Sequence, residues 1–285
     1  IARRQRQMCI RDSYKPNSAL ILSKRNSNIM ALTDTQSSFD SRNIDIPQVG
    51  IKDFRLPFQW RTRSGLQNTV GNISMYCYLP GRYKGTHMSR FIALMTRNIR
   101  PIDARSMREL TQELRDCLEA PEAEIYLEAP FFMEKRAPIS GQKSLMDYLV
   151  AYHIHQAKDG ASTQFLQVKV PVTSLCPCSK EISDFGAHNQ RSLITIKAQY
   201  EGTLEPETLI EIAESEASCD LYSLLKRPDE KYVTERAYTQ AKFVEDMARD
   251  LYRRLLEVKE IIHFTASSEN FESIHNHSAF AKVKA

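Results

Sequence analysis

The sequence lacks several features that would assign a protein to a class at first sight. No run approaches 18 consecutive apolar residues, so a transmembrane helix and a membrane partner are excluded. Neither G-x-x-x-x-G-K nor G-x-G-x-x-G is present, so any bound phosphate has to be held by side chains. The G-x-S-x-G elbow of serine hydrolases is missing as well.

Cysteine is too sparse and too irregularly spaced to build a disulfide framework. The chain of 285 residues has six cysteines, of which only two lie close together in sequence. A closed zinc site of four cysteines needs a second such pair and is therefore excluded. Free thiols in a long chain are typical of a reducing compartment, so the sequence predicts a cytoplasmic protein.

Basic charge is in excess only at the N-terminal end. The formal net charge is +4, but residues 1–29 contain seven Lys or Arg and one Asp, a net of +6. The rest has 32 basic and 34 acidic residues, a net of −2, so basicity does not predict a nucleic-acid partner. Residues 1–29 have the composition of a transit peptide, but part of them reads like a translated sequencing adapter. We expect a non-native or disordered leader before Met30.

The rest of the chain alternates between strand and helix patterns, with ordinary hydrophobic and charged fractions of 42% and 26%. After a flexible segment, residues 30–48, period-two alternation predicts a hairpin from Val49 to Leu79. The elements expected next are helices at 85–97 and 103–120 and strands at 122–132 and 144–157. A turn at Asp159-Gly160 closes this first module, residues 49–159.

The second half repeats the same order of elements. The expected elements are strands at 162–172 and 193–200, helices at 206–225 and 242–259, and strands at 261–267 and 278–284. Arg227-Pro228 is interpreted as a helix end, followed by an irregular segment up to Lys242. Two tandem β-β-α-α-β-β modules, residues 49–159 and 160–285, predict an α+β fold of antiparallel sheets with a helix pair on one face of each.

The residues that can carry chemistry gather between Ser174 and Ser192. Cys176 and Cys178 are one residue apart, and His188 follows after a glycine-containing turn. A thiolate, an imidazole and a carboxylate suit zinc, manganese or iron and leave one coordination position open for water. Two ordinary turn cysteines and a surface histidine are the alternative interpretation.

Carboxylates and histidines elsewhere in the chain can complete such a site. Glu230 and Glu245 stand in loops or at helix starts and are candidate ligands. Glu272, His275 and His277 form a second group, in which the two histidines face the same side of an extended segment. Histidine with carboxylate suits proton transfer near neutral pH, whereas exposed loop histidines are the alternative.

Several ordered segments carry a family resemblance. They are Ser174–Ser183, Gly186–Ser192, Leu224–Glu235, Phe243–Asp246 and Ser268–Ala279, with shorter ones at Gly85–Phe91 and Pro138–Gly141. These segments resemble GTP cyclohydrolase type IB, of the tunnelling-fold superfamily, over about residues 46–284. The resemblance implies a bimodular tunnelling fold, a homotetramer with active sites at subunit interfaces, and GTP as substrate. It further implies conversion of GTP and water to 7,8-dihydroneopterin triphosphate and formate, the first step of folate synthesis.

The resemblance also implies roles at the metal and the base. Cys176, His188 and Glu230 match the ligands of a divalent metal, for which Mn²⁺, Zn²⁺ and Fe²⁺ all remain open. Glu245 matches the guanine anchor, whose carboxylate accepts from the ring N–H and the exocyclic amine. Cys178, beside the metal thiolate, belongs to the catalytic group with a less defined role.

Proton transfer and phosphate binding are the remaining roles. Glu272 and His275 match the acid–base groups of the family. Basic side chains have to hold the triphosphate, and Arg191 and Lys231 are the candidates near the matched segments. Two other functions stay open: a nitrile reductase of queuosine synthesis, and a metal-stabilised binding module without catalysis. His188 and Glu230 at ligand positions argue against the reductase, which uses a cysteine and NADPH without a metal.

Overall fold

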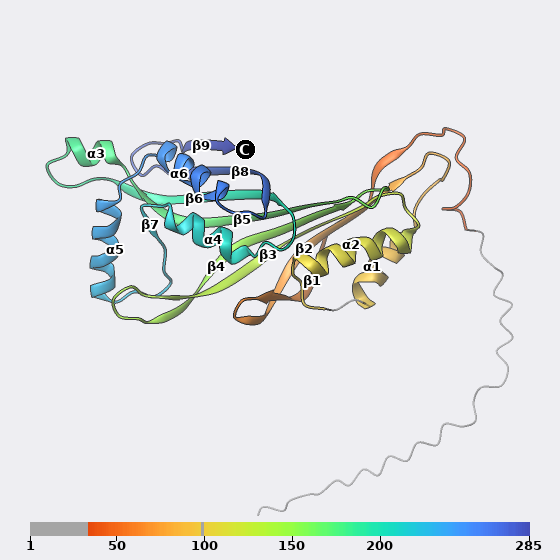
Figure 1. The fold of residues 1–285 in the computed structure, drawn as a ribbon, viewed down its shortest axis with the longest axis horizontal. Coiled ribbons are helices and arrows are strands. Elements are labelled where there is room, and N and C mark those ends of the chain that lie inside the picture. Colours follow the sequence, from red (N-terminus) through yellow and green to blue (C-terminus); the bar gives the residue numbers. More distant parts are fainter. Residues whose placement is uncertain (1–33, 98–99) are drawn as a thin grey trace, which may run out of the picture. The chain divides into compact units, whose positions relative to one another are not determined.

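The computed structural model describes residues 34–97 and 100–285 (Figure 1). The first half contains β1 (Ile46–Thr62), β2 (Gly65–Leu79), α1 (Met88–Arg97), α2 (Ala104–Leu118), β3 (Ala123–Arg136) and β4 (Lys143–Gln156). The second half contains β5 (Ser162–Leu175), α3 (Pro177–Ile182), β6 (Asn189–Tyr200), α4 (Pro206–Ser215), β7 (Cys219–Asp220), α5 (Arg227–Thr239), α6 (Val244–Leu256), β8 (Ile261–Asn270) and β9 (Ala279–Lys284). The leader predicted at 1–29 lies outside the described residues. Within the described ranges, no helix is long and apolar enough to cross a membrane.

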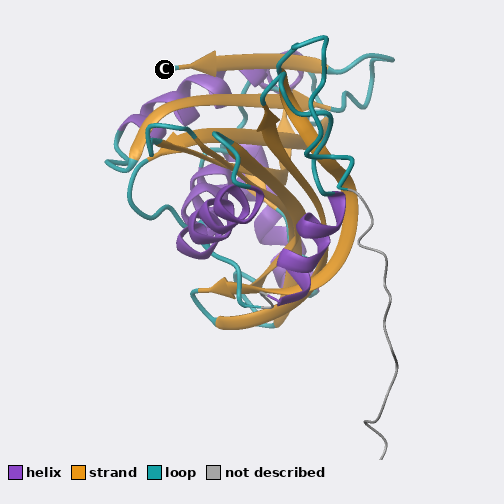
Figure 2. Cartoon of the chain, turned by 90° about the vertical axis from the view of Figure 1, so that its right-hand side faces the viewer, coloured by secondary structure: helices purple, strands orange, loops and turns teal. Residues whose placement is uncertain are grey.

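The strands form one antiparallel sheet rather than two separate ones. Its order is β1-β2-β3-β4-β5-β6-β8-β9, and β7 pairs with β5 beside this path. Strand β4 pairs with β5 from Leu149↔Lys169 to Gln156↔Ser162, so the sheet continues across the predicted module boundary. Helices α1 and α2 cover the first half, and α4 and α6 cover the second (Figures 1 and 2). The α+β class with antiparallel strands predicted from the sequence is confirmed.

Alternation along the strands directs one row of side chains toward the helices. On β6, Ile194, Ile196 and Ala198 are fully buried, while the residues between them face the other side of the sheet. One large hydrophobic cluster includes buried residues of both halves, and Leu175, Cys219 and Ala237 form a second, smaller one. Residues Thr35–Ala285 accordingly form one compact unit.

Helix α5 corrects the prediction of an irregular segment between Pro228 and Lys242. The proline lies in the first turn of the helix, where its missing N–H would have no intrahelical partner anyway. The Asp229 carboxylate accepts a hydrogen bond of 2.8 Å from the Lys226 N–H, which closes that first turn. A proline at this position fits a helix start as well as a helix end. The predicted helix end at Arg227-Pro228 is therefore wrong, because a helix begins there. The short elements α3 and β7 were not predicted either.

Two turns of the first half make polar contacts with helices of the second half. In the β1–β2 turn, Arg63 Nε lies 2.6 Å from Glu205 Oε2, and its Nη1 lies 2.8 Å from Glu211 Oε1 on α4. In the β3–β4 turn, the Ser140 hydroxyl donates to Asp229 Oδ2 at 2.6 Å. The first turn thus holds α4, and the second holds the start of α5, relative to the first half of the sheet.

Candidate metal and catalytic site

Cys176 and His188 lie side by side at one end of the sheet. Cys176 follows β5 directly and is the N-cap of α3, and His188 directly precedes β6. The Cys176 N–H donates to the His188 carbonyl oxygen at 3.2 Å, which continues the β5–β6 pairing by one residue. The Cys176 sulfur accepts from the Ser179 N–H at 3.4 Å, which fixes the orientation of the side chain at the start of α3.

Hydrogen bonding fixes the His188 ring in an orientation suited to metal binding. Its Nδ1 lies 3.0 Å from Gln190 Oε1. Because an amide oxygen only accepts, Nδ1 carries the proton, and the lone pair on Nε2 is left for a metal ion. A hydrogen bond from the distal ring nitrogen of a ligating histidine is the usual way to fix its tautomer.

A buried polar network holds Gln190 in place. The Gln190 amide nitrogen donates to the Ser174 hydroxyl at 2.8 Å, and the Ser174 and Ser192 hydroxyls are hydrogen-bonded at 2.7 Å. The Ser192 hydroxyl also lies 2.8 Å from Asn270 Oδ1, at the end of β8. The four side chains are buried, so their mutual hydrogen bonds replace water and restrict the rotamer of Gln190.

The segment after β8 brings a carboxylate to the histidine. Glu272 Oε2 lies 3.9 Å from His188 Nδ1, and the two side chains are only 12% and 13% exposed. The Ser273 hydroxyl lies 3.5 Å from the same nitrogen. Further along, the His275 and His277 rings stack at 5.2 Å, so they lie on one side of the segment and are exposed. The structure thus places the predicted acid–base carboxylate beside a predicted metal ligand.

Three other predicted residues lie on elements that adjoin this end of the sheet. Glu245 is exposed in the first turn of α6, and the start of that helix is tethered by a 3.2 Å hydrogen bond from the Lys242 N–H to the Leu175 carbonyl. Cys178 is exposed on α3. Arg191 is exposed on β6, and its carbonyl oxygen accepts from the Phe271 N–H at 3.0 Å.

Glu230 and Lys231 lie on α5 and are both exposed. Lys231 Nζ is 3.7 Å from Glu235 Oε1 on the same helix. In residues 34–97 and 100–285, no three His, Cys, Asp or Glu side chains are grouped as they would be around a metal ion. Cys176 and His188 lie side by side and have the chemistry of metal ligands. Glu230, the third predicted ligand, is not grouped with them in the described part of one chain.

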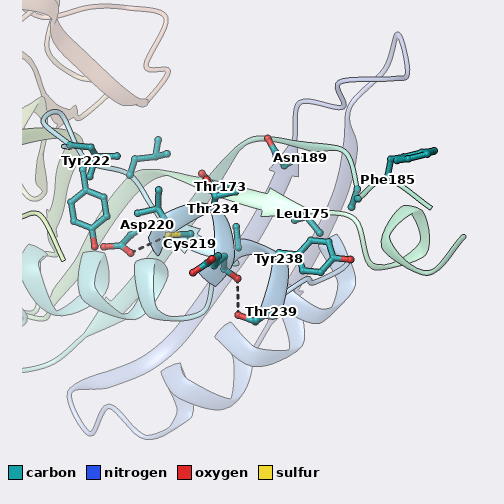
Figure 3. Close-up of a pocket in the computed structure, with 17 residues that line it drawn as sticks. Thr173, Leu175, Phe185, Asn189, Cys219, Asp220, Tyr222, Thr234, Tyr238 and Thr239 are labelled. Atoms are coloured by element: carbon teal, nitrogen blue, oxygen red, sulfur yellow. Dashed lines mark hydrogen bonds between the residues drawn. The ribbon is translucent and has the colours of Figure 1, made fainter. Parts of the chain in front are cut away.

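A pocket of about 720 Å³ lies next to the Cys176–His188 pair, between the end of β5, β7 and α5 (Figure 3). Leu175 and Asn189, the chain neighbours of Cys176 and His188, line it, and Tyr238 of α5 forms part of its wall. Figure 3 shows the Phe185 side chain extending away from the other lining residues. None of the residues predicted for catalysis, substrate or metal belongs to its lining.

Asp220 connects this pocket to a buried ion cluster. Lys135 Nζ lies 2.5 Å from Asp220 Oδ2 and 2.8 Å from Glu214 Oε1. Burial raises the pKa of Asp220, but the Lys135 ammonium outweighs this effect and leaves the pKa below its ordinary value. Burial raises the pKa of Glu214, and burial together with the Asp220 charge raises the pKa of Cys219 to about 11. The Cys219 thiol is therefore protonated at neutral pH.

Two functional residues were missed in the sequence. Gln190 and Ser273 both contact His188 Nδ1, yet neither was singled out. The sequence carried a signal for Gln190. It occupies an even-numbered position of its strand, like Ile194 and Ile196, so its side chain is on the same buried face. A polar residue in an inward-facing row indicates a buried hydrogen-bond network.

Comparison with known proteins gives one family. The family described as type I GTP cyclohydrolase folE2 matches residues 32–281. The chain is 51% identical over 252 residues to GTP cyclohydrolase FolE2 of Neisseria meningitidis serogroup A, covering 88% of this chain and 84% of that protein. It is 51% identical over 253 residues to FolE2 of Neisseria gonorrhoeae, covering 89% and 98% of the two chains. FolE2 2 of Cupriavidus metallidurans is 50% identical over 253 residues, with coverages of 89% and 94%.

Solved structures resemble the chain more distantly. A uricase from Arthrobacter globiformis matches with a TM-score of 0.49 and 9% sequence identity, over 83% of this chain and 92% of that chain. A urate oxidase from Bacillus sp. TB-90 matches with a TM-score of 0.48 and 9% identity, over 84% and 99% of the two chains.

Proposed function

The chain belongs to the type I GTP cyclohydrolase FolE2 family, and on that premise we propose that it converts GTP and water to 7,8-dihydroneopterin triphosphate and formate. This reaction would supply the first intermediate of folate synthesis. The observation that carries the proposal is the convergence of Cys176, His188 and Glu272 at one end of the sheet. A cysteine, an oriented imidazole and a nearby carboxylate are groups that hydrolytic metal sites use as ligands and proton carriers.

We infer that Cys176, His188 and Glu230 hold a divalent metal, with Mn²⁺, Zn²⁺ and Fe²⁺ as candidates. Thiolate, imidazole and carboxylate donors suit all of these ions. When bound, such an ion would supply Lewis acidity for activating the water that attacks C8 of guanine. Gln190 accepts a hydrogen bond from the His188 Nδ1–H and would thereby hold Nε2 ready for the ion.

Proton transfer is assigned to Glu272 and His275, with Cys178 beside the metal thiolate as a further catalytic group. Opening the imidazole ring of guanine requires protonation of its nitrogen, and the later sugar rearrangement requires repeated proton transfer. The Glu272 carboxylate is largely buried beside His188, so it can pass protons near the reacting base. His275 and His277 are exposed and stacked, and His275 follows Glu272 by three residues on the same segment, which supports a role for it in exchanging protons with solvent.

Substrate binding is assigned to Glu245, Arg191 and Lys231. The Glu245 carboxylate can accept both the N1–H and the exocyclic amine of guanine, a pair of donors that adenine does not present. The tether between Lys242 and Leu175 supports this role, because it holds the start of α6 next to the end of β5. Arg191 and Lys231 provide exposed positive charge for the triphosphate, whose binding energy is remote from the reacting carbon.

The proposed assembly is a homotetramer with active sites at subunit interfaces, and the proposed location is the cytoplasm. The cysteines in the described part of the chain, Cys77, Cys117, Cys176, Cys178 and Cys219, are all free thiols. Free thiols are consistent with a reducing compartment.

The test is turnover of GTP by the purified protein after chelation and reloading with single metals. We expect a product that fluoresces like neopterin after oxidation and phosphatase treatment, with activity returning for at least one metal. Glu245→Gln should raise the KM for GTP more than it lowers kcat, because it weakens recognition of the base. Absence of fluorescent product with manganese, zinc and iron(II) alike would reject the proposed function.

A further inference from the structure

Asn270, at the end of β8, is the far end of a buried hydrogen-bond network that begins at His188. Strand pairing aligns its members, because Ser174 of β5 is opposite Gln190 of β6, and Ser192 of β6 is opposite Asn270. The four residues after His188 in this network are at most 8% exposed. Buried polar groups need partners within the protein, so the geometry of the His188–Asn270 network decides where each of its protons lies.

The protons can be placed from the Asn270 end. Asn270 Oδ1 only accepts, so the Ser192 hydroxyl at 2.8 Å donates to it. A hydroxyl has one proton, and the 2.7 Å contact between Ser174 and Ser192 is therefore made by the proton of Ser174. Ser174 accepts in turn from the amide nitrogen of Gln190 at 2.8 Å, which leaves the Gln190 oxygen facing His188. All four hydrogen bonds thus run in one direction, from His188 to Asn270.

The same side chains can form the reverse set of hydrogen bonds only if both amides turn over. Asn270 would then donate to Ser192, and Gln190 would donate to His188 Nδ1. The ring proton of His188 would lie on Nε2, the nitrogen proposed to bind the metal ion. A network with mixed directions leaves a buried group unpaired, which is unfavourable, so its members change direction together. The orientation of Asn270 therefore selects the tautomer of a histidine four hydrogen bonds away.

Contacts at the end of β8 hold Asn270 with its oxygen toward the network. The Ser268 hydroxyl, which is fully buried on the same strand, lies 3.4 Å from Asn270 Oδ1 and can act as a second donor. The next residue, Phe271, donates its N–H to the Arg191 carbonyl at 3.0 Å. This bond keeps the end of β8 paired with β6, so the side chain of Asn270 stays level with its partner.

Other groups near the His188 ring do not select the tautomer. Glu272 Oε2 is 3.9 Å from Nδ1, which is beyond hydrogen-bonding distance. The Ser273 hydroxyl, at 3.5 Å from Nδ1, can donate as well as accept. Gln190 at 3.0 Å is closer than either, so the direction of its amide decides which ring nitrogen carries the proton.

We propose that Asn270 is a positioning residue for His188: its carboxamide oxygen sets the direction of the His188–Asn270 network and thereby keeps the ring proton on Nδ1. Nε2 is then unprotonated before any ion binds, which lowers the cost of ordering the site. The inference rests on the proposed function only for the use of Nε2 as a metal ligand. The position of the proton is a property of the chain itself.

Solid-state ¹⁵N NMR of the chelated full chain, labelled at histidine, measures the position of the proton. At about pH 8.5, where free histidine is neutral, wild type should show His188 as the Nδ1–H tautomer. Loss of the signal in His188→Gln assigns it. Ser192→Ala and Asn270→Leu should each show the two tautomers in about equal amounts, because neither direction is then favoured by the end of the network. If both variants keep His188 entirely as Nδ1–H, the inference is overturned.

Titration with Mn²⁺ is the second readout. Ser192→Ala and Asn270→Leu should each bind Mn²⁺ about 2- to 10-fold more weakly, twofold from the wrong tautomer in half of the molecules and the rest from a less fixed ring. Thr111→Val is the matched control, since its buried hydroxyl donates to the Met107 carbonyl at 2.8 Å on α2. It should leave tautomer and affinity unchanged. An equal loss of affinity in Thr111→Val and Ser192→Ala would indicate general destabilisation and overturn the inference.

A double-variant comparison separates action through Gln190 from any other route. In a Gln190→Leu background, Asn270→Leu should cause no further loss of Mn²⁺ affinity, because the network is already cut beside His188. Additive losses would show that Asn270 acts by another route and would contradict its role. If Asn270→Leu fails to fold, Ser192→Ala replaces it with the same expectations. If wild type binds neither Mn²⁺, Zn²⁺ nor Fe²⁺, the proposed ligand set fails, whereas the NMR result still decides the inference.

Discussion

Cys176 and His188, twelve residues apart in sequence, are joined by a backbone hydrogen bond of 3.2 Å from the Cys176 N–H to the His188 carbonyl. The bond continues the register of β5 and β6, so the sheet sets the spacing of the two proposed ligands. A site fixed by strands needs little reorganisation when a ligand binds, and this lowers the free-energy cost of binding.

Gln190→Leu should weaken Mn²⁺ binding about 10- to 100-fold. The substitution removes the acceptor at 3.0 Å from His188 Nδ1, so the ring loses its fixed tautomer and orientation. Titration of the purified protein with Mn²⁺ measures the effect. Gln164→Leu is the matched control. Gln164 is buried like Gln190 but lies on β5 and makes no contact with His188, so this variant should leave the Mn²⁺ affinity unchanged. Equal losses in both variants would contradict the role given to Gln190.

Arg63→Ala should lower the free energy of unfolding by about 1 kcal/mol, because it removes partly exposed ion pairs to Glu205 and Glu211. GTP turnover at a temperature well below unfolding should stay unchanged, since no partner of Arg63 belongs to the proposed site. Arg105→Ala, which breaks an exposed pair with Glu109, should cost less than about 0.5 kcal/mol. Denaturant unfolding measures the loss of stability in both variants. An equally small loss for Arg63→Ala and Arg105→Ala would contradict a stabilising role for the Arg63 ion pairs with Glu205 and Glu211.

Asp220→Asn should destabilise the protein by about 3 kcal/mol near neutral pH, because it leaves the buried Lys135 with one partner fewer. The folded-state pKa of Asp220 lies below the ordinary 3.8. Its stabilising effect is therefore fully present above that value and is lost as pH falls through the lower folded-state pKa. The difference between wild type and variant should be constant above about pH 5 and shrink below about pH 4. A difference that grows on acidification would contradict this prediction.

Cys219 should resist alkylation that modifies Cys117. Burial raises the pKa of Cys219 to about 11, and the side chain is only 2% exposed, whereas Cys117 is exposed. The thiolate is the reactive form, so iodoacetamide at pH 8 should label Cys117 at least about 10-fold faster. Mass spectrometry of the digested protein measures both rates. Comparable labelling in the folded protein would show that the lining of the pocket is more open than described.

The sequence predicted the long strands and the amphipathic helices well, because a period of two or of 3.6 is a local property. It misread α5, since Pro228 suits a helix start as well as a helix end and the cap at Asp229 comes partly from Ser140, far away in the chain. Cys176 and His188 were predicted together because they flank adjacent strands. The position of Glu230 in the first turn of α5 could not be predicted, because it depends on contacts of that helix with the β3–β4 turn and with α3.

The most direct measurement uses GTP labelled with isotopic carbon at C8 and follows the label through turnover by the metal-loaded enzyme. Hydrolysis at C8 predicts that all of the label leaves as formate, with one formate for each pterin formed. Cys176→Ala should reduce formate and pterin together, because both depend on the same metal site. Label that stays in the nucleotide or the pterin, or nucleotide turnover without labelled formate, would contradict the proposed reaction.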